Sequence, residues 1–367
     1  MKLIIFSQYF YPFKGGIQRL IKSRIDCLEK SKLKKTLLIS SEPYKNYNKE
    51  LRQIKINYTK NRLQQFFSTF LSILKLVYKE NYIQIECASI YPSGIASAII
   101  KFFSRKKIRL IIYLHGDEIL KSQNNYCYLV LIKFTCIFCN ELISNSNFIK
   151  KFFKSKINKN TKINIINPIP SRNFIKKSNL KKNKNYTLLS VCRLVDKKNL
   201  INQIYSFEKI YLKYSKKYRK LKYIICGSGP EYDKIKKIIK SRNLGKVVKI
   251  YNNVNDSKLI QFYKSSDIFL MTTLTNFKKN SIEGFGISAL EASLFGMTCI
   301  LPKNSGSEDL KKFGGVKFFV DGNSLKQIEN SILYALKICK NKKKINSSIK
   351  GANKLIYNSI KKYKSKF

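Results

Sequence analysis

Short apolar runs alternate with longer stretches of helical period along most of the chain. Between the runs that begin at Leu3 and Thr36, for example, Ile17, Leu20 and Ile25 recur at helical spacing and form one apolar face. Apolar runs joined in this way predict strands buried in a parallel sheet, with helices as the connections. In the first half we expect strands at residues 3–6, 36–39, 110–114, 142–144 and 163–166.

A polar and basic stretch from about Pro170 to Asn185 interrupts this pattern and is typical of a linker. A chain of 367 residues is long enough for two domains that each bury their own core. The alternation then resumes and predicts a second doubly wound sheet, with strands at 187–191, 223–226, 247–250, 268–271 and 298–301. We therefore predict an N-terminal domain over residues 1–175, a C-terminal domain over 176–345, and a basic helix or tail over 346–367.

The formal net charge of +52 favours a polyanionic partner. Part of this charge reflects coding bias, because Lys, Asn, Ile and Tyr are abundant together, as AT-rich codons supply. The remainder favours a basic face on an anionic membrane surface. A nucleic-acid-binding protein is the alternative from another class, but it predicts clustered Arg with interleaved aromatic residues. Since Lys is spread along the whole chain, we predict no nucleic-acid partner.

Cysteine usage and apolar runs bear on where the protein works. The nine cysteines lack the spacing of a disulfide framework, and the CxxC pair Cys136 and Cys139 lies in an apolar run without a second pair or a nearby His. The run 126–139 is interrupted by Lys133 and is shorter than the about 20 residues that span a membrane. We predict no metal site and no transmembrane segment. We expect a cytoplasmic protein, peripheral on the inner face of the cell membrane.

The amphipathic segment 63–78 admits two interpretations. It contains Phe67 and Leu71 and is flanked by Lys75 and Lys79, as in helices that lie at a membrane interface. An ordinary helix that turns its apolar face to the core is the interpretation that we favour.

Two carboxylates, Glu283 and Glu291, stand eight residues apart, the first in a glycine-rich turn and the second about two turns into the helix that follows. Gly284 and Gly286 permit close approach of a phosphate to backbone N–H groups, and the helix N-terminus favours the same anion. The acids would repel a diphosphate, so we expect them to bind hydroxyl groups of a ribose or hexose. The alternative is a helix-capping Glu283 and a solvated Glu291.

Positive charge for a diphosphate follows the first strand of the second sheet. Arg193 and Lys198 lie there, at the carboxyl edge where such folds bind ligands, and Arg193 is the stronger candidate because Arg is scarce in this chain. Gly227 and Gly229 end the next strand in a tight turn that lacks the GxGxxG pattern of dinucleotide sites. A plain turn and a nucleotide contact both stay open for these glycines.

The first half offers two further candidates. Gly15 and Gly16 open a helix whose amides could meet a phosphate. His115, the single histidine of the chain, ends a strand beside Gly116, again at a carboxyl edge. A structural and a catalytic role both stay open for His115.

Together these motifs resemble glycosyltransferase family 4, the retaining nucleotide-sugar transferases of GT-B fold, from the first strand to about residue 325. The matching positions are Glu283 and Glu291 for the Glu-x7-Glu motif, Arg193 and Lys198 for the diphosphate pair, Gly15 and Gly16 for the N-terminal glycine loop, and His115 for the cleft histidine. Four positions depart from the family pattern: Cys192 before the Arg, Asn199 after the Lys, Asn167-Pro168 in place of Asn-Gly, and Met271-Thr272-Thr273 in place of a Pro-Ser ending.

The resemblance implies an α/β fold of two Rossmann-like domains that face each other across a cleft. The first would bind the acceptor and the second the donor. Glu291 would bind the ribose, while Glu283 and the amides around Phe285 to Ile287 would bind the donor sugar and phosphates. Gly16 would contact the diphosphate, and His115 would lie near the reacting sugar.

The implied reaction moves a sugar from a nucleoside-diphosphate sugar to a hydroxyl of a glycan acceptor, with retention and without a metal or other cofactor. By analogy the acceptor is a lipid-linked precursor of a bacterial surface polysaccharide such as lipopolysaccharide. A nucleotide-sugar epimerase of the same fold is the alternative enzyme, and it would turn over donor with no acceptor present.

Overall fold

The computed structural model describes residues 2–8, 10, 15–41, 50–56, 61–79, 82–122, 125–157, 159–176, 185–218, 220–277 and 281–366. The chain forms two compact units, here described separately. Unit 1 comprises Met1–Ile169 and Ser359–Phe367, and unit 2 comprises Pro170–Asn358. Our predicted boundary lay between residues 175 and 176, whereas the chain enters unit 2 at Pro170. The basic C-terminal segment is helical and its last residues belong to unit 1.

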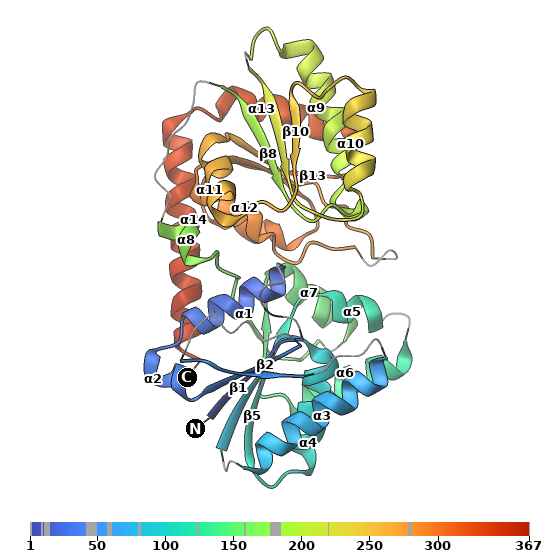
Figure 1. The fold of residues 1–367 in the computed structure, drawn as a ribbon, viewed down its shortest axis with the longest axis vertical. Coiled ribbons are helices and arrows are strands. Elements are labelled where there is room, and N and C mark those ends of the chain that lie inside the picture. The colour runs from blue at the N-terminus through green and yellow to red at the C-terminus, as the bar shows by residue number, and fades with distance from the viewer. Residues whose placement is uncertain are drawn as a thin grey trace. The chain divides into compact units, whose positions relative to one another are not determined.

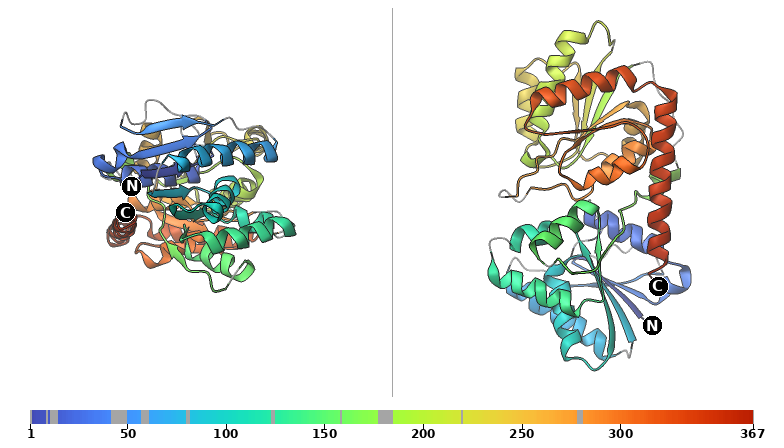
Figure 2. Two further views of the ribbon diagram at one scale, coloured as in Figure 1. Left: turned by 90° about the horizontal axis from the view of Figure 1, so that it is seen from below. Right: turned by 180° about the vertical axis from the view of Figure 1, so that it is seen from behind.

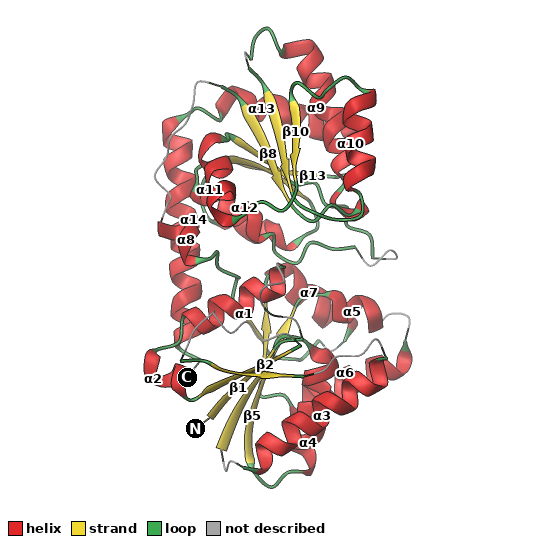
Figure 3. Ribbon diagram, viewed as in Figure 1, coloured by secondary structure: helices red, strands yellow, loops and turns green. Residues whose placement is uncertain are grey.

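Unit 1 is a Rossmann-like domain around a parallel sheet, in which the described residues form seven strands in the order β3-β2-β1-β4-β5-β6-β7 (Figures 1 and 3). The strands are β1 Lys2–Phe6, β2 Thr36–Ser40, β3 Arg52–Lys55, β4 Tyr82–Cys87, β5 Lys107–Leu114, β6 Glu141–Ser144 and β7 Ile163–Ile165. The helical elements are α1 Gly16–Asp26, α2 Lys30–Lys34, α3 Arg62–Tyr78, η1 Ile90–Gly94, α4 Ile95–Phe103, α5 Asp117–Ser122, α6 Tyr126–Phe138 and α7 Asn147–Lys156.

The apolar face predicted for residues 17–28 is buried in unit 1. Leu20, Ile21 and Ile25 of α1 pack against Leu3 and Ile5 of β1 in one hydrophobic cluster. Burial of each such aliphatic side chain contributes roughly 1.5–3 kcal/mol. Helices α3, α4 and α6 lie side by side on the other face of the sheet (Figure 1).

Unit 2 repeats the architecture. Its described strands are all parallel, in the order β10-β9-β8-β11-β12-β13. They are β8 Thr187–Val191, β9 Lys222–Cys226, β10 Val248–Tyr251, β11 Ile268–Leu270, β12 Thr298–Pro302 and β13 Lys317–Val320. The helical elements are α8 Arg172–Lys176, η2 Asp196–Lys198, α9 Leu200–Tyr214, α10 Tyr232–Ser241, α11 Asp256–Ser265, α12 Ile287–Leu294, η3 Gly306–Lys312 and α13 Leu325–Ile338. Helix α14 Lys342–Lys364 begins in unit 2, and its residues from Ser359 onward belong to unit 1.

A buried ion pair lies at the centre of unit 1. Arg24 of α1 binds Glu86 of β4 through two hydrogen bonds, Nε to Oε2 at 2.8 Å and Nη2 to Oε1 at 2.7 Å, and both side chains are 0% exposed. Gln84 donates to Oε1 at 2.8 Å and Tyr113 donates to Oε2 at 2.9 Å. The remaining guanidinium nitrogen, Nη1, donates to the carbonyl oxygen of Tyr363 at 3.1 Å. The pair thus joins a helix, two strands and the C-terminal segment.

Each of these two groups shifts the pKa of the other in the direction that favours its charged form. Burial alone would raise the pKa of Glu86, but the charge and hydrogen bonds of Arg24 bring it below the ordinary value of 4.5. Burial likewise would lower the pKa of Arg24, yet Glu86 raises it above its ordinary value. Both groups are therefore charged at neutral pH.

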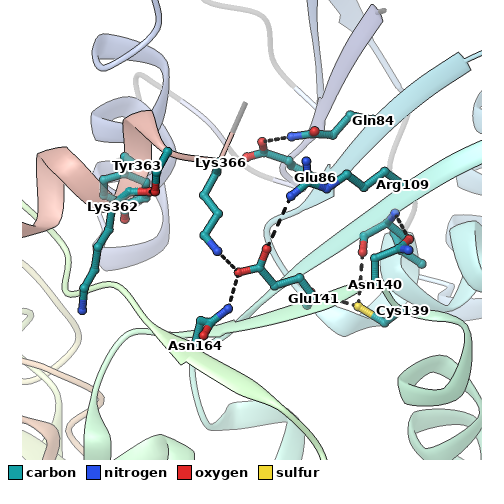
Figure 4. A network of polar contacts seen from close by, with 12 residues as sticks. Gln84, Glu86, Arg109, Cys139, Asn140, Glu141, Asn164, Lys362, Tyr363 and Lys366 are labelled. Carbon is teal, nitrogen blue, oxygen red and sulfur yellow. Dashed lines mark hydrogen bonds and ion pairs between the residues drawn. The ribbon is translucent and has the colours of Figure 1, made fainter.

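The C-terminal segment makes further polar contacts with unit 1 (Figure 4). Lys362 donates to the carbonyl oxygen of Ile165 at 2.9 Å, and Lys366 forms an ion pair with Glu141. Glu141 also accepts a hydrogen bond from Asn164 at 2.6 Å. Both views in Figure 2 show the C-terminus beside the N-terminus, and both ends belong to unit 1.

Among the described residues, no helix is both long enough and apolar enough to cross a membrane.

We predict that Arg24→Met lowers the free energy of unfolding by about 3–5 kcal/mol, because it leaves the Glu86 carboxylate buried without its cation. Urea unfolding of the whole chain measures this. Lys22→Met is the matched control on the same helix, since it removes the Lys22–Asp26 pair at 2.9 Å, whose side chains are 23% and 21% exposed. The control should cost less than about 1 kcal/mol. Equal losses in the two variants would contradict the interpretation.

Candidate active site

The strand order of unit 2 reverses between β8 and β11, and the candidate residues gather there. Strands β9 and β10 continue the sheet on one side of β8, while β11, β12 and β13 continue it on the other. Ligands of doubly wound sheets bind at the carboxyl ends of the strands where the order reverses. The loops that leave β8 and β11 carry Arg193, Lys198 and Thr273 to this edge.

Lys198, Thr273 and Glu283 form a compact polar cluster. Lys198 Nζ lies 2.5 Å from Glu283 Oε2 and 3.5 Å from Thr273 Oγ1. The Thr273 hydroxyl donates to the same carboxylate oxygen at 3.2 Å. The Lys198 and Glu283 side chains are largely buried, at 17% and 13% exposed. The sequence analysis assigns Lys198 to a diphosphate and Glu283 to a sugar. In the structure the two side chains bind each other.

The charge states of this cluster follow from its geometry. Burial alone would raise the pKa of Glu283, but Lys198 outweighs it and the pKa lies below the ordinary value of 4.5. Burial would lower the pKa of Lys198, but Glu283 raises it above 10.5. Arg193, which is exposed, opposes that rise, so its guanidinium lies close enough to act on Lys198 electrostatically. The site thus contains a carboxylate paired with Lys198, and Arg193 acts on that lysine.

Asn199 joins three loops at this edge. Its Nδ2 donates to the carbonyl oxygen of Gly322 at 2.7 Å and to that of Thr272 at 3.2 Å. Its backbone is left-handed, with φ 59° and ψ 33°, a conformation that Gly and Asn adopt more readily than other residues. Asn199, which stands where the family usually has glycine, therefore keeps the left-handed backbone conformation. It also adds a side chain that connects the loops by hydrogen bonds.

Gln203 is a functional candidate that the sequence analysis missed. Its Nε2 donates to the carbonyl oxygen of Lys198 at 2.9 Å and to Thr272 Oγ1 at 3.1 Å. Its Oε1 accepts from Ser190 at 2.9 Å and from Tyr223 at 2.8 Å. This buried amide positions the backbone of Lys198. The available signal was a polar residue on the apolar face of α9, next to Leu200 and Ile204 in helical spacing.

The glycine-rich turn before α12 requires glycine at 286 because of its left-handed backbone. Gly286 has φ 82°, and a Cβ there would lie 2.9 Å from Met271 Cε. Helix α12 begins at Ile287, so the amides of Ile287 and Ser288 belong to its first turn. The Phe285 side chain is buried, which leaves only its backbone for a ligand. Gly306 N donates to the carbonyl oxygen of Glu283 at 2.8 Å and fixes the entry to the turn.

Glu291 differs sharply from Glu283. It is 0% exposed and accepts a hydrogen bond from Tyr263 at 2.9 Å. Tyr263 in turn stacks on Phe295, with ring centroids 5.5 Å apart.

The alternative of a capping Glu283 and a solvated Glu291 is wrong, because Glu283 binds Lys198 and Glu291 is buried. The expected depth of Glu291 is also wrong: since α12 begins at Ile287, Glu291 lies about one turn into it, not two.

Gly227 and Gly229 have a packing explanation. A Cβ on Gly227 would lie 1.8 Å from the carbonyl oxygen of Cys192, and one on Gly229 would lie 2.3 Å from that of Leu194. Hydrogen bonds reinforce this approach, since Leu194 N donates to Ser228 O at 2.9 Å. The two glycines let the loop after β9 support the loop that carries Arg193. The structure therefore accounts for them without a nucleotide contact.

Gly15, Gly16 and His115 belong to unit 1. Gly15 caps α1 and Gly16 is its first residue; a Cβ on Gly15 would meet the flexible Gln18 side chain, whereas one on Gly16 would meet nothing within 4 Å. His115 follows β5, and its Nε2 lies 2.7 Å from the carbonyl oxygen of Ala88, the residue after β4. Because a carbonyl only accepts, Nε2 is the donor of this bond, and in the neutral ring Nδ1 is the acceptor.

Metal-binding groups are not found in the described part of the chain: no cluster of three or more His, Cys, Asp or Glu side chains is placed to hold an ion. The CxxC pair is partly buried, and Cys139 Sγ donates to the carbonyl oxygen of Glu141 at 3.0 Å. Burial raises the pKa of Cys136 to about 12. Both thiols therefore have the properties of packing residues.

The sequence of unit 2 identifies its family. Residues 171–352 match the family described as "Glycosyl transferases group 1". This domain belongs to the group 1 glycosyl transferases. An uncharacterized glycosyltransferase from Haemophilus influenzae is 26% identical over 162 residues, which are 44% of this chain. That match covers 41% of the relative, so the chain spans about two fifths of its length.

Solved structures share the fold over the full chain. HepE from Anabaena, in complex with UDP and glucose, has a TM-score of 0.75 at 16% identity and covers 100% of this chain and 98% of its own. Sucrose-phosphate synthase from Thermosynechococcus elongatus has a TM-score of 0.76 at 13% identity, over 100% and 97%. The lipopolysaccharide outer core galactosyltransferase WaaB in its apo form has a TM-score of 0.70 at 16% identity, over 100% of both chains. The fold is GT-B.

The predicted α/β fold of two Rossmann-like domains and the predicted glycosyltransferase family are thus confirmed. The assignment to family 4 and the roles of individual residues stay predictions.

We predict that the coupling free energy between Lys198→Met and Glu283→Gln, measured by urea unfolding of the single and double variants, is roughly 1–3 kcal/mol at pH 7. Because the pKa of Glu283 is below 4.5, the coupling should be complete above that pH and decline as the pH falls through the lowered pKa. Because the pKa of Lys198 is above 10.5, the coupling should persist on the basic side until the pH exceeds that value.

The matched control is the Lys209–Glu329 pair at 3.0 Å, in which Lys209 is 62% exposed. Its coupling should be smaller, because water screens an exposed pair. A Lys198–Glu283 coupling that equals the control, or that does not change between pH 7 and strongly acidic pH, would refute the buried ion pair.

Proposed function

We propose that the chain is a retaining glycosyltransferase that moves a sugar from a nucleoside-diphosphate sugar to a hydroxyl of a glycan acceptor. The group 1 domain at residues 171–352 supports the transfer of a sugar. The structures of HepE with UDP, glucose and UDP-glucose support a nucleotide-sugar donor. Neither another cofactor nor a metal ion is part of the proposal.

The observation that carries the proposal is the cluster of Lys198, Thr273 and Glu283 beside Arg193, at the point where the strand order of unit 2 reverses. A diphosphate needs cations, and here two cations lie on one strand-end loop. A sugar needs acceptors for its hydroxyl hydrogens, and Glu283 stays ionised at neutral pH because Lys198 lowers its pKa. Because the site is partly buried, the attraction of the cations for the diphosphate and the hydrogen bonds of Glu283 to the sugar are both stronger than in water.

The proposed reaction breaks the bond between the anomeric carbon and the leaving diphosphate and forms one to the acceptor oxygen on the same face of the sugar. The acceptor proton passes to an oxygen of the leaving phosphate. Arg193, Lys198 and the amides around Phe285 to Ile287 stabilise the negative charge that grows on the diphosphate. This balance requires no protein nucleophile.

The remaining residues position the donor in this proposal. Glu291 binds the ribose, with Tyr263 holding its carboxylate in place beforehand. Gly16 approaches the diphosphate through its backbone. His115 lies near the reacting sugar and offers Nδ1 to a hydroxyl, since Nε2 is used by Ala88. Gly227 and Gly229 act on the donor indirectly, through the loop of Arg193.

We propose a lipid-linked precursor of a surface polysaccharide as the acceptor and the inner face of the cell membrane as the place of work. The similarity to the fold of WaaB, a lipopolysaccharide galactosyltransferase, supports this choice as an analogy. The net charge of +52 supports a surface rich in anionic lipid.

The experiment that tests the function is a panel of nucleotide sugars, each incubated with and without lipid-linked glycan acceptors. We expect nucleoside diphosphate to be released only when an acceptor is present, together with a glycosylated product. Donor converted to an isomer without acceptor would establish the epimerase instead. Tight, steeply salt-dependent binding of generic DNA or RNA, without any sugar transfer, would establish the nucleic-acid-binding alternative.

We predict that Arg193→Ala reduces transfer by roughly 10²–10³-fold, because one charge partner of the leaving diphosphate is lost. The melting temperature should stay unchanged, since the Arg193 side chain is exposed. Arg242→Ala is the control, an arginine of unit 2 that is 50% exposed and lies at the end of α10. Glu283→Gln should reduce transfer to a similar extent. Undiminished turnover in Arg193→Ala or Glu283→Gln would refute the assignment.

A second prediction concerns Gly16. A Cβ at this position meets nothing within 4 Å in the protein, so Gly16→Ala should leave the melting temperature equal or slightly higher. It should nevertheless weaken binding of the nucleoside diphosphate, measured by calorimetry, by about tenfold or more, because the methyl group occupies the space of the phosphate. Gly245→Ala also meets nothing within 4 Å and is the matched control. Equal affinities in the two variants would exclude Gly16 from the donor site.

A further inference from the structure

Three neighbouring helices of unit 1 expose large apolar side chains. Helix α3 packs on α4, and α4 packs on α6 (Figure 1). We call the outward side of these helices the α3–α4–α6 surface. Its exposed members include Leu63 and Phe67 of α3, Phe103 of α4 and Ile137 of α6, with exposures of 68%, 59%, 78% and 75%. Exposed apolar patches of this kind mark interaction sites.

Helix α3 is oriented against its own amphipathic pattern. It buries Gln65 and Thr69 in its first half, while Leu63, Phe67 and Leu71 are exposed. The buried Thr69 hydroxyl has no hydrogen-bond partner among the described residues. A surface helix normally turns its apolar stripe to the core. The favoured interpretation of residues 63–78 as a core-facing helix therefore holds only for the second half.

Helix α6 has exposed apolar side chains, and Lys133 is its single charged residue. Of its thirteen residues, Ile132 and Thr135 are buried, while Val130 and Ile137 are exposed. A helix that is hydrophobic all round is ordinarily enclosed by protein or lipid. Phe134 and Phe138 of α6 contact Phe102 of α4, with ring centroids 6.0 and 5.0 Å apart. The aromatic residues thus make the surface continuous between the two helices.

The charges around this surface have one sign. Residues 62–79, 95–107 and 125–140 contain no Asp or Glu. Basic residues border the apolar side chains, among them Arg62, Lys75, Arg105, Lys107 and Lys133, and each of these is exposed. Apolar and aromatic side chains bordered by Lys and Arg match the chemistry of an anionic bilayer, in which apolar groups enter the headgroup region and cations remain at its surface.

We infer that the α3–α4–α6 surface docks the protein on an anionic lipid bilayer, with Phe67, Phe103 and Ile137 entering the interface. A second copy of the chain fits less well, because a symmetric interface would bring the same basic residues face to face. Basic charge alone does not distinguish this surface: α14 also lacks acidic residues, yet Tyr357 is its one exposed large apolar side chain in the described chain. The inference deepens the membrane location in the proposed function, on which it rests.

The test measures sedimentation of the full chain with vesicles of phosphatidylcholine and phosphatidylglycerol, and with vesicles of phosphatidylcholine alone. The wild type should bind the anionic vesicles. The triple variant Phe67→Ser, Phe103→Ser, Ile137→Ser should bind them at least about tenfold more weakly. Its melting temperature should stay the same, because the replaced side chains are exposed.

The matched control replaces three exposed apolar residues outside this surface, Leu212→Ser, Tyr334→Ser and Tyr357→Ser, whose exposures are 73%, 57% and 68%. This control should bind anionic vesicles like the wild type. Size-exclusion chromatography with light scattering should show one oligomeric state for all three proteins.

Four results would overturn the inference: no binding of the wild type to anionic vesicles, equal binding to neutral vesicles, equal losses in the triple variant and the control, or a dimer that the triple variant dissociates. The last would identify the surface as a contact between copies. Vesicle binding is measured without donor, and donor binding is measured without vesicles. Failure of the docking surface and failure of the proposed transfer are therefore separate results.

Discussion

The strands of both described sheets are parallel, and this constraint decides where the chain can bind a ligand. Parallel strands end at one edge, so polar loop residues that are distant in sequence must meet there. In unit 2 that edge receives the loops after β8, β11 and β13, and Asn199 connects all three. The Lys198–Glu283 pair depends on this arrangement, since its members come from different loops 85 residues apart.

Much of this fold follows from hydrophobic pattern. The predicted strands at 3–6, 36–39 and 187–191 match β1, β2 and β8 within a residue at each end. Strand β4 was not predicted, because Gln84 and Glu86 interrupt its apolar pattern. No local pattern reveals that Arg24, from a distant helix, neutralises Glu86. The sequence likewise does not predict which side of α3 is exposed. Periodicity gives the width of an apolar stripe but not whether the stripe faces the core or the solvent.

The candidate site, like the fold, could be predicted from the sequence only in part. Residue type and spacing singled out Arg193, Lys198 and Glu283 as groups that address one ligand, and the structure joins Lys198 and Glu283 directly. Gln203 and Tyr263 could not be found in this way. Each acts through a contact between elements. Gln203 donates a hydrogen bond to the backbone of Lys198, and Tyr263 donates one to the carboxylate of Glu291. Helical spacing alone does not predict these contacts. Spacing along the chain predicts the participants in a site more readily than the residues that support them.

The C-terminal segment has a consequence for how the molecule is made. The guanidinium of Arg24 donates a hydrogen bond to the carbonyl oxygen of Tyr363, which lies 339 residues later in the chain. Arg24 therefore leaves the ribosome 339 residues before Tyr363 does. Unit 1 therefore stays incomplete during synthesis until the residues after unit 2 have emerged, because Nη1 of the buried Arg24 lacks this acceptor before then. The hydrogen bond between Arg24 and Tyr363 can thus form only after the whole of unit 2 has been synthesised.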